Sequence, residues 1–300
     1  RLRWTGMEME GVRKLLPCLS ASLHKGSCGK IGIVGGSLQY SGAPFFSGLA
    51  MLRVGVDLVH VFAPPEAAAV IKTYSPDLMV HPSQEPDYVE EYLPRLHALL
   101  IGPGLGRSPS ASLLVHRLLV AAAKHRLPTV VDADGLFALT EKWPEIHSHS
   151  DAVLTPNAAE LDRLAFKVLE KHTLNASSHE MEATVSELAS KLGMAILVKG
   201  QRDHFYDLDG SHRELDSPGN LRRPGGIGDL LSGILTAFLL WARWAGEEEE
   251  KRLAVSAACS LVREASRVTE HEMGRGMLAS DVIHRIAPLL RHIEHPSSSE

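Results

Sequence analysis

The sequence is poor in the residues that define several specialised classes of protein. Its 300 residues include only three cysteines, Cys18, Cys28 and Cys259, and none lies in a CxxC pair or at a Cys/His metal spacing. Reduced thiols are therefore expected, rather than a disulfide framework or a structural zinc site. The formal net charge is −5 and no Lys/Arg-rich run occurs. Because nucleic-acid binding needs a basic patch to neutralise phosphates, no nucleic-acid partner is expected.

A membrane-spanning run of apolar residues is also missing. The most apolar segment, residues 230–244, is interrupted by Arg243 and falls short of the roughly 20 residues that span a bilayer. We expect a buried helix there, no membrane partner, and a soluble, intracellular protein. Hydrophobic residues form 44% of the chain, enough to build a globular core. With no internal repeat or Pro/Ser-rich linker, residues 1–300 are predicted to form a single domain with a disordered tail over residues 293–300.

Short β-rich runs alternate with helix-length stretches along most of the chain. The runs are almost continuously apolar, as in parallel strands buried on both faces, and cover residues 30–36, 56–62, 98–104, 129–134, 152–157 and 195–200. Helices are expected at 43–54, 108–125, 135–142, 158–166, 177–192, 229–244, 251–268 and 279–290, with Ser280 as a helix start. Residues 203–216, with an Asp209-Gly210 turn, predict an antiparallel hairpin. This pattern predicts an α/β fold, an open and mostly parallel sheet with helices on both faces.

Polar or glycine-rich loops follow four of the predicted strands. They are "IVGGSLQYSGAP" (33–44), "IGPGLGRSPS" (101–110), "LTPNAAELDRL" (154–164) and "VKGQRD" (198–203). Because open α/β sheets bind ligands beyond the carboxyl ends of their strands, these loops should gather there with "PGGIGD" (224–229). "GPGLGR" lacks the full G-x-G-x-x-G spacing and does not follow the first strand, and no P-loop motif is present.

Several residues of these loops also have purely structural explanations. The glycines of the 101–107 loop are equally consistent with a tight turn between strand and helix. Asp132 and Asp134 could form a metal pair, but Asp134 is better placed as the cap of the following helix. Asn157 is a natural N-cap that Glu160 would complete as a capping box, and Lys199 could simply be solvated. Five such loops at successive strand ends nevertheless favour a binding site.

The stretch "RRPGGIGDLLSG" (222–233) combines glycines with a single carboxylate, Asp229, where a long helix begins. Glycines let backbone N–H groups approach a ligand closely, and a helix N-terminus carries partial positive charge. The stretch therefore predicts an anion-binding loop. Asp229 is then either an N-cap or a base aimed at the group that attacks the bound anion.

Together these motifs resemble the ATP/ADP-dependent NAD(P)H-hydrate dehydratase family, and its eukaryotic branch most closely. The resemblance runs from about residue 12 to residue 290 and is carried by the opening block (24–62), "IGPGLGR" (101–107), "VVDADGL" (130–136), "LTPNAAELDRL", "KGQRD" and "RRPGGIGDLLSG". It implies a ribokinase-like fold. The last block alone is shared with sugar and vitamin kinases of that fold, whereas the opening block and "LTPN-x-x-E" are more specific.

The resemblance implies a repair enzyme for damaged nicotinamide cofactors. NADH and NADPH can be hydrated at the dihydronicotinamide ring. The family phosphorylates the added hydroxyl with ATP or ADP and Mg²⁺, after which phosphate leaves and the double bond returns. The expected small-molecule substrate is therefore NAD(P)H hydrate, in either form. By the same analogy we expect the mitochondrion and/or the cytoplasm, and a homo-oligomer is left open.

The resemblance also implies a role for each residue of the motifs. Asp229 would be catalytic and contact the substrate hydroxyl. The nucleotide would be bound by Lys199, Gly200, Gln201, Arg202, Asp203, Gly219, Asn220, Leu221, Arg222, Arg223, Pro224, Gly225, Gly226, Ile227 and Gly228. The hydrated dinucleotide would be bound by Gly106, Asn157, Ala158, Ala159, Glu160, Leu161, Asp162, Arg163 and Asp229. No metal ligands are assigned.

Two residues of the glycine stretch depart from the family pattern. Ile227 stands where Thr or Gln is common, and Pro224 has no N–H to offer an anion. Two other functions remain open: a sugar or vitamin kinase of the same fold, which would use Asp229 identically, and a nucleotide-binding regulator without catalysis. A kinase has no reason to carry "LTPNAAELDRL" and "IGPGLGR" together, and a pure binder gains nothing from a carboxylate beside phosphates.

Overall fold

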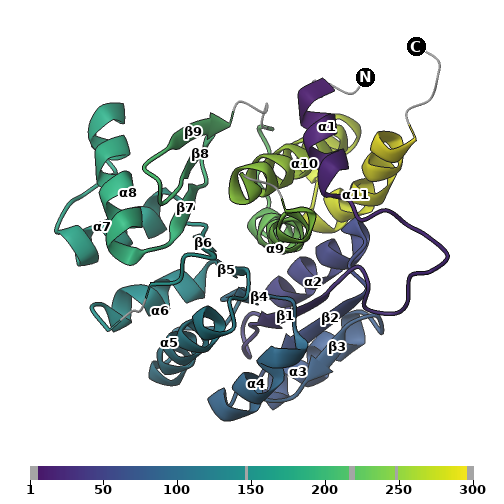
Figure 1. Cartoon of the computed structure of the whole chain (residues 1–300), viewed down its shortest axis with the longest axis horizontal. Coiled ribbons are helices and arrows are strands. Elements are labelled where there is room, and N and C mark those ends of the chain that lie inside the picture. The colour runs from purple at the N-terminus through teal and green to yellow at the C-terminus, as the bar shows by residue number, and fades with distance from the viewer. Residues whose placement is uncertain (1–5, 146–147, 216–219, 247–248, 296–300) are drawn as a thin grey trace.

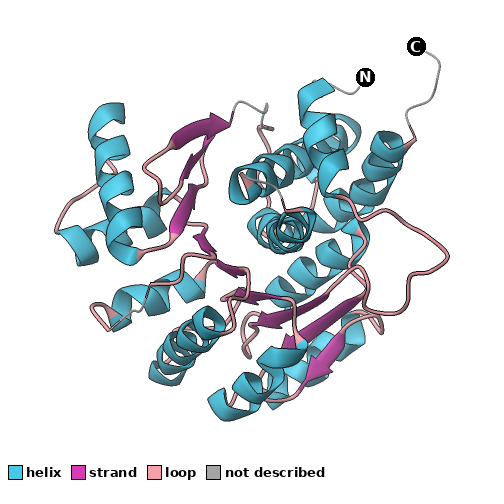
Figure 2. Ribbon diagram, in the orientation of Figure 1, coloured by secondary structure: helices cyan, strands magenta, loops and turns pink. Residues whose placement is uncertain are grey.

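The computed structural model describes residues 6–145, 148–215, 220–246 and 249–295, and these build one nine-stranded sheet between two layers of helices (Figures 1 and 2). The strands are β1 (Lys30–Val34), β2 (Leu58–Phe62), β3 (Met79–His81), β4 (Ala98–Ile101), β5 (Thr129–Val131), β6 (Ala152–Leu154), β7 (Ala195–Val198), β8 (Asp203–Tyr206) and β9 (His212–Leu215). Their order is β3-β2-β1-β4-β5-β6-β7-β8-β9. Neighbours from β3 to β7 pair in parallel, and β7, β8 and β9 pair antiparallel. The predicted α/β fold and the terminal hairpin are confirmed.

The helices divide between the two faces of the sheet. They are α1 (Gly6–Leu15), α2 (Gly42–Val54), α3 (Pro65–Tyr74), α4 (Pro86–Tyr92), α5 (Pro109–Lys124), α6 (Asp134–Lys142), α7 (Ala158–Leu169), α8 (Ser178–Leu192), α9 (Ile227–Ala245), α10 (Glu250–Met273) and α11 (Ala279–Glu294). One core cluster joins α1, α2, α3, α9, α10 and α11 to the sheet, and a second joins α4 to α8 to its other face. Adjacent residues such as Ile33 and Val34 face opposite clusters, which explains why the strands read as continuous apolar runs.

Helix α9 is the centre of the first core. Thirteen of its residues are buried, and Figure 1 shows it enclosed among α1, α2, α10, α11 and the sheet. Within the described chain it is the one helix long and apolar enough to cross a membrane by length and composition, and 72% of its apolar window is buried in the protein. Its hydrophobicity is accounted for by this packing, as expected for residues 230–244.

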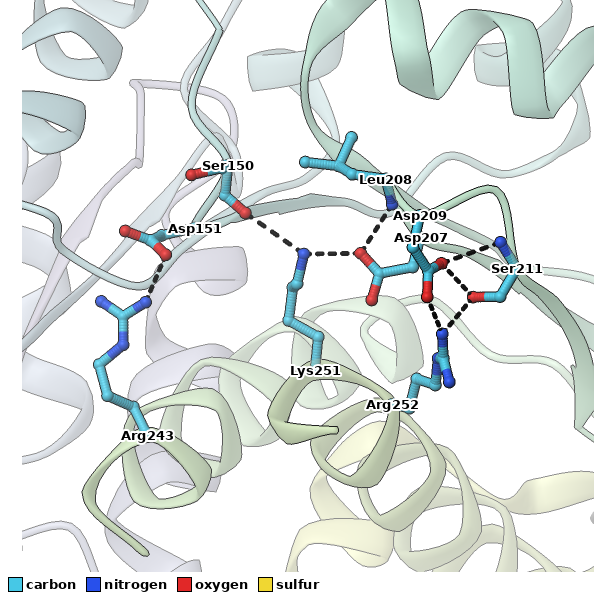
Figure 3. Close-up of polar contacts among 9 residues, drawn as sticks. All are labelled: Ser150, Asp151, Asp207, Leu208, Asp209, Ser211, Arg243, Lys251 and Arg252. Atoms are coloured by element: carbon cyan, nitrogen blue, oxygen red, sulfur yellow. Dashed lines mark hydrogen bonds and ion pairs between the residues drawn. The ribbon is translucent and has the colours of Figure 1, made fainter. Parts of the chain in front are cut away.

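Ion pairs tie the start of α10 to the β8–β9 turn (Figure 3). Lys251 Nζ lies 2.6 Å from a carboxylate oxygen of Asp207 and also contacts the carbonyl of Ser150. The neighbouring Arg252 pairs with Asp209. Since β8 and α10 border the same pocket, described below, these contacts fix the separation of two of its walls.

Four elements were not predicted: α1, α3, α4 and β3. Each is short, at 10, 10, 7 and 3 residues. None of the three β3 residues is fully buried. These elements bury few apolar residues, so no apolar run or periodicity distinguished them from loops.

Three smaller predictions were wrong at element ends. The N-cap of α6 is Ala133, and Asp134 is the first helical residue, because its carboxylate bonds to a neighbouring loop instead. Ser280 lies inside α11, whose start is closed by Asp281 accepting from the N–H of Leu278 at 2.8 Å. Of the predicted tail, residues 293 and 294 belong to α11, and residues 296–300 lie outside the described residues.

Candidate active site

The predicted loops meet at the carboxyl edge of the parallel strands. The loops after β1 and β4 touch, because the N–H of Gly36 donates to the carbonyl of Pro103 at 2.9 Å. Gly102, at φ +121°, passes so close to the loop after β5 that a Cβ there would lie 1.9 Å from the carbonyl oxygen of Asp132. The glycines therefore serve the tight turn and also allow three loops to approach one another.

An ion pair between Asp132 and Lys199 forms the middle of the site. Asp132 follows β5 and is 2% exposed, and its Oδ1 lies 2.6 Å from Nζ of Lys199, which follows β7. The parallel pairing of β6 and β7 continues into the segments that follow them. Asn157 and Lys199 form an isolated parallel bridge, and the N–H of Lys199 donates to the carbonyl of Pro156 at 2.8 Å. This pairing brings the start of α7 against Lys199.

Asp229 lies in the first turn of α9, next to this pair. The N-cap of α9 is Gly226, at φ +98° and without a side-chain cap, so Asp229 is the third helical residue and not the N-cap. A Cβ on the preceding Gly228 would lie 3.7 Å from Nζ of Lys199. Burial raises the pKa of Asp229 to about 7, and Asp132 adds to this while Lys199 opposes it. A carboxylate with this pKa is suited to accept a proton near neutral pH.

Three carboxylates stabilise the charge of the Lys199 ammonium, and of these Asp132 is in direct contact with it. Burial works against its charge, but Asp132, Glu160 and Asp229 outweigh burial and raise the pKa of Lys199. Burial also raises the pKa of Glu160, with a further contribution from Asp132, against the opposing effects of Lys199 and the N–H of Asn157. The cluster thus contains one group that stays positively charged, Lys199, and two carboxyl groups with a raised pKa, Glu160 and Asp229. It lies at the N-terminal end of α9.

A pocket of about 350 Å³ opens beside this cluster, between α9, α10 and the β7–β8 turn. Its lining residues are Asn157, Lys199, Gly200, Asp203, Asn220, Arg222, Arg223, Pro224, Ile227, Gly228, Leu231, Cys259, Val262, Arg263 and Ser266. Two buried polar atoms there, Nε of Arg222 and Oγ of Ser266, have no hydrogen-bond partner among the described residues. Because unpaired buried polar groups are costly, these atoms point to a polar ligand.

Some residues of "KGQRD" line the pocket, and others stabilise the turn that forms its wall. Lys199, Gly200 and Asp203 line the pocket, whereas Gln201 is exposed and Arg202 pairs with Glu214 on β9. The carboxylate of Asp203 accepts from the N–H of Gly200 at 3.0 Å and so holds the turn closed. In this way the motif shapes one wall of the pocket.

The stretch from 219 to 228 contributes the opposite wall. Asn220, Arg222, Arg223, Pro224, Ile227 and Gly228 line the pocket, while Gly225 and Gly226 lie outside its lining and Gly219 lies outside the described residues. Leu221 is 96% exposed. The N–H groups of Leu221 and Arg222 donate to Glu270 of α10, at 3.2 and 2.7 Å, which anchors the loop to that helix.

The residues predicted for the dinucleotide lie on the α7 side of the cluster. Asn157 and Glu160 form the predicted capping box, with hydrogen bonds of 2.8 and 3.0 Å. Ala158 and Ala159 are exposed beside it. Leu161, by contrast, is buried in the core.

Asp162 turns away from the cluster and accepts from the N–H groups of Thr173 and Leu174.

Gly106 and Arg163 each contact a residue of α6. The N–H of Gly106 donates to the carboxylate of Asp134 at 3.0 Å, and Arg107 pairs with the same carboxylate at 2.9 Å. The guanidinium groups of Arg107 and Arg163 lie 4.8 and 5.8 Å from the ring centroid of Phe137. Asp132 and Asp134 therefore have different partners, and the described residues contain no group of three or more metal-ligating side chains.

Sequence reasoning missed the contribution of α10. Cys259, Val262, Arg263, Ser266 and Glu270 all face the pocket or its loop. Arg263 donates to Asp203 at 2.8 Å and to the carbonyls of Gln201 and Gly200 at 3.0 and 3.1 Å. The spacing of three and four residues, in a helix that was predicted, is the signal that would have placed them on one face.

The fold and site define an α/β protein in which a glycine-rich helix start lies beside a buried carboxylate of raised pKa. The family model of NAD(P)H-hydrate dehydratase matches residues 31–288, and the chain belongs to this family. It is 42% identical over 292 residues to the ATP-dependent (S)-NAD(P)H-hydrate dehydratase of Ixodes scapularis, covering 92% of each chain.

Solved structures agree on the fold. A ribokinase-like superfamily protein from Enterococcus faecalis superimposes with a TM-score of 0.79 at 20% identity, covering 95% of this chain and 94% of its own. The ADP/ATP-dependent NAD(P)H-hydrate dehydratase of Bacillus subtilis, co-crystallised with ATP/Mg²⁺, gives 0.72 at 23% identity, covering 94% and 97%. The predicted ribokinase-like fold is confirmed.

Proposed function

We propose that the protein returns hydrated NADH and NADPH to NADH and NADPH in a nucleotide-dependent dehydration. Family membership supports this function over the sugar or vitamin kinase. The observation that carries the chemistry is the position of Asp229, a largely buried carboxylate with a pKa of about 7 in the first turn of α9, next to Lys199. A group at that place can deprotonate a hydroxyl while the helix amides face the phosphate under attack.

In the first half of the reaction, the substrate hydroxyl attacks the terminal phosphorus of the nucleotide. Asp229 takes the hydroxyl proton, the new O–P bond forms, and the bond to the leaving nucleotide oxygen breaks. The amides at the start of α9 and the Lys199 ammonium stabilise the charge on the transferring group. In the second half, phosphate leaves the ring carbon and the double bond is restored.

The 350 Å³ pocket suits the nucleotide. Leu231, Val262 and Ile227 give it an apolar wall for a base, and Gly228 at the start of α9 also lines it. Arg222, with its unpaired Nε, offers a charged donor to the phosphates. ATP and ADP are both proposed as phosphoryl donors.

Mg²⁺ is proposed to enter with the nucleotide. The described residues offer no cluster of three ligating side chains, and Oδ1 of Asp132 already contacts Lys199. This donor set fits a cation that would be held mainly by the phosphates and would keep several waters. When bound, the cation would neutralise charge on the phosphates.

The hydrated dinucleotide is proposed to lie along the start of α7, with Gly106 and Arg163 beyond it. NADH and NADPH hydrates are both proposed as substrates. We also propose, from the family resemblance, a place in the mitochondrion and/or the cytoplasm.

The formation of ADP distinguishes this function from the kinase. We would incubate the protein with ATP and Mg²⁺ and add hydrated NADH, a set of sugars, or hydroxylated vitamins. ADP should form only with the hydrate. The Asp229→Asn variant should lose this activity, whereas Asp87→Asn, at a position 90% exposed on the surface, should retain it. ADP release with a sugar or vitamin but not with the hydrate would contradict the proposal.

A further inference from the structure

The proposed reaction removes two protons from the substrate at different steps, and Asp229 accounts for the first. Water adds to the ring double bond so that the hydroxyl lies on the carbon next to nitrogen and a hydrogen on the neighbouring carbon. Restoring the double bond must remove that hydrogen as a proton. After phosphoryl transfer Asp229 already carries the hydroxyl proton, so a second acceptor is needed. This inference rests on the proposed function.

Glu160 occupies the position that such an acceptor requires. It lies in the first turn of α7, and one of its carboxylate oxygens, Oε2, accepts from the N–H of Asn157 at 2.8 Å. Its other oxygen forms no hydrogen bond within the described part of the chain. The Asn157–Lys199 bridge holds this turn beside Lys199, and on the α9 side a Cβ placed on Gly228 would lie 3.7 Å from the same ammonium. Glu160 and Asp229 therefore converge on Lys199 from two helices.

The other carboxylates at this edge are engaged elsewhere. Asp132 is 2% exposed, and its Oδ1 contacts both Lys199 and the N–H of Ala133. Asp203 is held by Arg263 and the N–H of Gly200, as described above.

Asp134 is likewise held, by Gly106 and Arg107. Apart from Asp229, Glu160 is the one carboxylate of this edge, among the described residues, that combines partial exposure with an oxygen free of any hydrogen-bond partner. Its raised pKa, due mainly to burial, makes it a stronger proton acceptor than an ordinary glutamate.

We propose that Glu160 is the second base of the reaction and removes the ring C–H proton as phosphate departs. The lone pair of the ring nitrogen forms a C=N bond, and the C–O bond breaks with its electrons leaving on phosphate, which takes up the proton that Asp229 holds. Glu160 then takes the proton from the neighbouring carbon. The C–H electrons form the C=C bond and the nitrogen regains its lone pair, so no further reactant is needed.

The Glu160→Gln variant separates this role from a structural one. Glutamine also completes a capping box, so the helix start is retained. A matched control exists in α8, where Ser177 and Glu180 form the same capping box away from the site. In rapid-quench experiments with hydrated NADH and ATP/Mg²⁺, ADP release and the return of dihydronicotinamide absorbance would be followed separately in Glu160→Gln and Glu180→Gln.

We expect Glu160→Gln to release ADP in the first turnover at a rate within about tenfold of the unmodified protein. The return of absorbance should slow by about 10²- to 10⁴-fold, the usual contribution of a proton-transfer group, so phosphorylated hydrate accumulates. Glu180→Gln should keep the two signals together. If ADP and absorbance stay coupled in Glu160→Gln, whether both fast or both slow, Glu160 is not the second base. If the unmodified protein itself forms no ADP with the hydrate, the proposed function fails instead.

Discussion

At the scale of single residues, the protonation state of Asp229 controls the chemistry. Its carboxylate is buried beside Asp132, and only the Lys199 ammonium favours its charged form. The net effect is a pKa of about 7, well above that of an ordinary aspartate. Activity should therefore depend on pH in a range where exposed aspartates no longer titrate.

We predict that kcat falls as the pH drops through about 7, because Asp229 must be charged to accept a proton. Well below this pKa the decrease should approach about tenfold for each pH unit. The measurement is kcat for hydrated NADH at saturating ATP between pH 5 and pH 8.5. If kcat stays constant down to pH 5, the group that accepts the proton has an ordinary carboxylate pKa.

The raised pKa of Asp229 also predicts a stability effect of unusual sign. The folded protein binds this proton more tightly than the unfolded chain does. The free energy of unfolding therefore decreases as the pH rises from about 4 through about 7, because Asp229 must then lose the proton in its buried site. Asp229→Asn should therefore raise the free energy of unfolding at pH 8 by about 1–3 kcal/mol, since each pKa unit corresponds to about 1.4 kcal/mol. The gain should vanish near pH 4. Urea unfolding at the two pH values measures it.

Asp209 provides the opposite case. Hydrogen bonds from Ser211, with a smaller contribution from Arg252, lower the pKa of Asp209 to about 2. Its charged form thus favours the folded state at pH values above about 4, and this contribution is lost as the pH falls through about 2. Asp209→Asn should lower stability at neutral pH. The same sign for both variants would contradict the electrostatic account of the site.

At the scale of elements, the site depends on how the β8–β9 hairpin is held against α10. The Lys251–Asp207 pair joins them with side chains that are only 17% and 13% exposed, and Arg263 joins Asp203 to the same helix further along. A pair shielded from water is worth more than one on the surface, and removing one partner leaves the other charge poorly solvated.

We predict that Lys251→Met lowers the free energy of unfolding by about 1–3 kcal/mol. Lys171→Met is the matched control, because Lys171 and Glu187 are also 2.6 Å apart but about half exposed, so its effect should be within about 0.5 kcal/mol. Urea denaturation of both variants measures the difference. Equal decreases in the free energy of unfolding would show that burial of the Lys251–Asp207 pair contributes nothing to stability.

The elements themselves were predicted where the sequence repeats a pattern often enough. Runs such as residues 56–62 and 195–200 are short and apolar with glycine or charge at their ends, and each became a strand of the sheet. β3 and α4 were not predicted, because β3 has no fully buried residue and α4 buries only Val89, so neither carries an apolar pattern. The turn at Asp209-Gly210 was predicted from local chemistry alone.

At the scale of the whole molecule, the site exists only because distant segments meet. Asp132, Lys199 and Asp229 are separated by 30 residues or more, and the parallel order of β5, β6 and β7 brings the first two to one edge. The motifs identified this edge because parallel strands end together. The inner face of α10 could not be predicted to join it. Nothing local indicates that Arg263 faces Asp203, a contact set by how α10 packs over the sheet.

The measurement that tests the central claim most directly is the return of dihydronicotinamide absorbance when hydrated NADH is mixed with the protein, Mg²⁺ and ATP. Asp229 as the base beside a phosphate-binding helix start predicts recovery that requires nucleotide. It also predicts one ADP for each NADH restored, and a rate about 10²- to 10⁴-fold lower in Asp229→Asn. Recovery without nucleotide, or at an undiminished rate in that variant, would contradict the account.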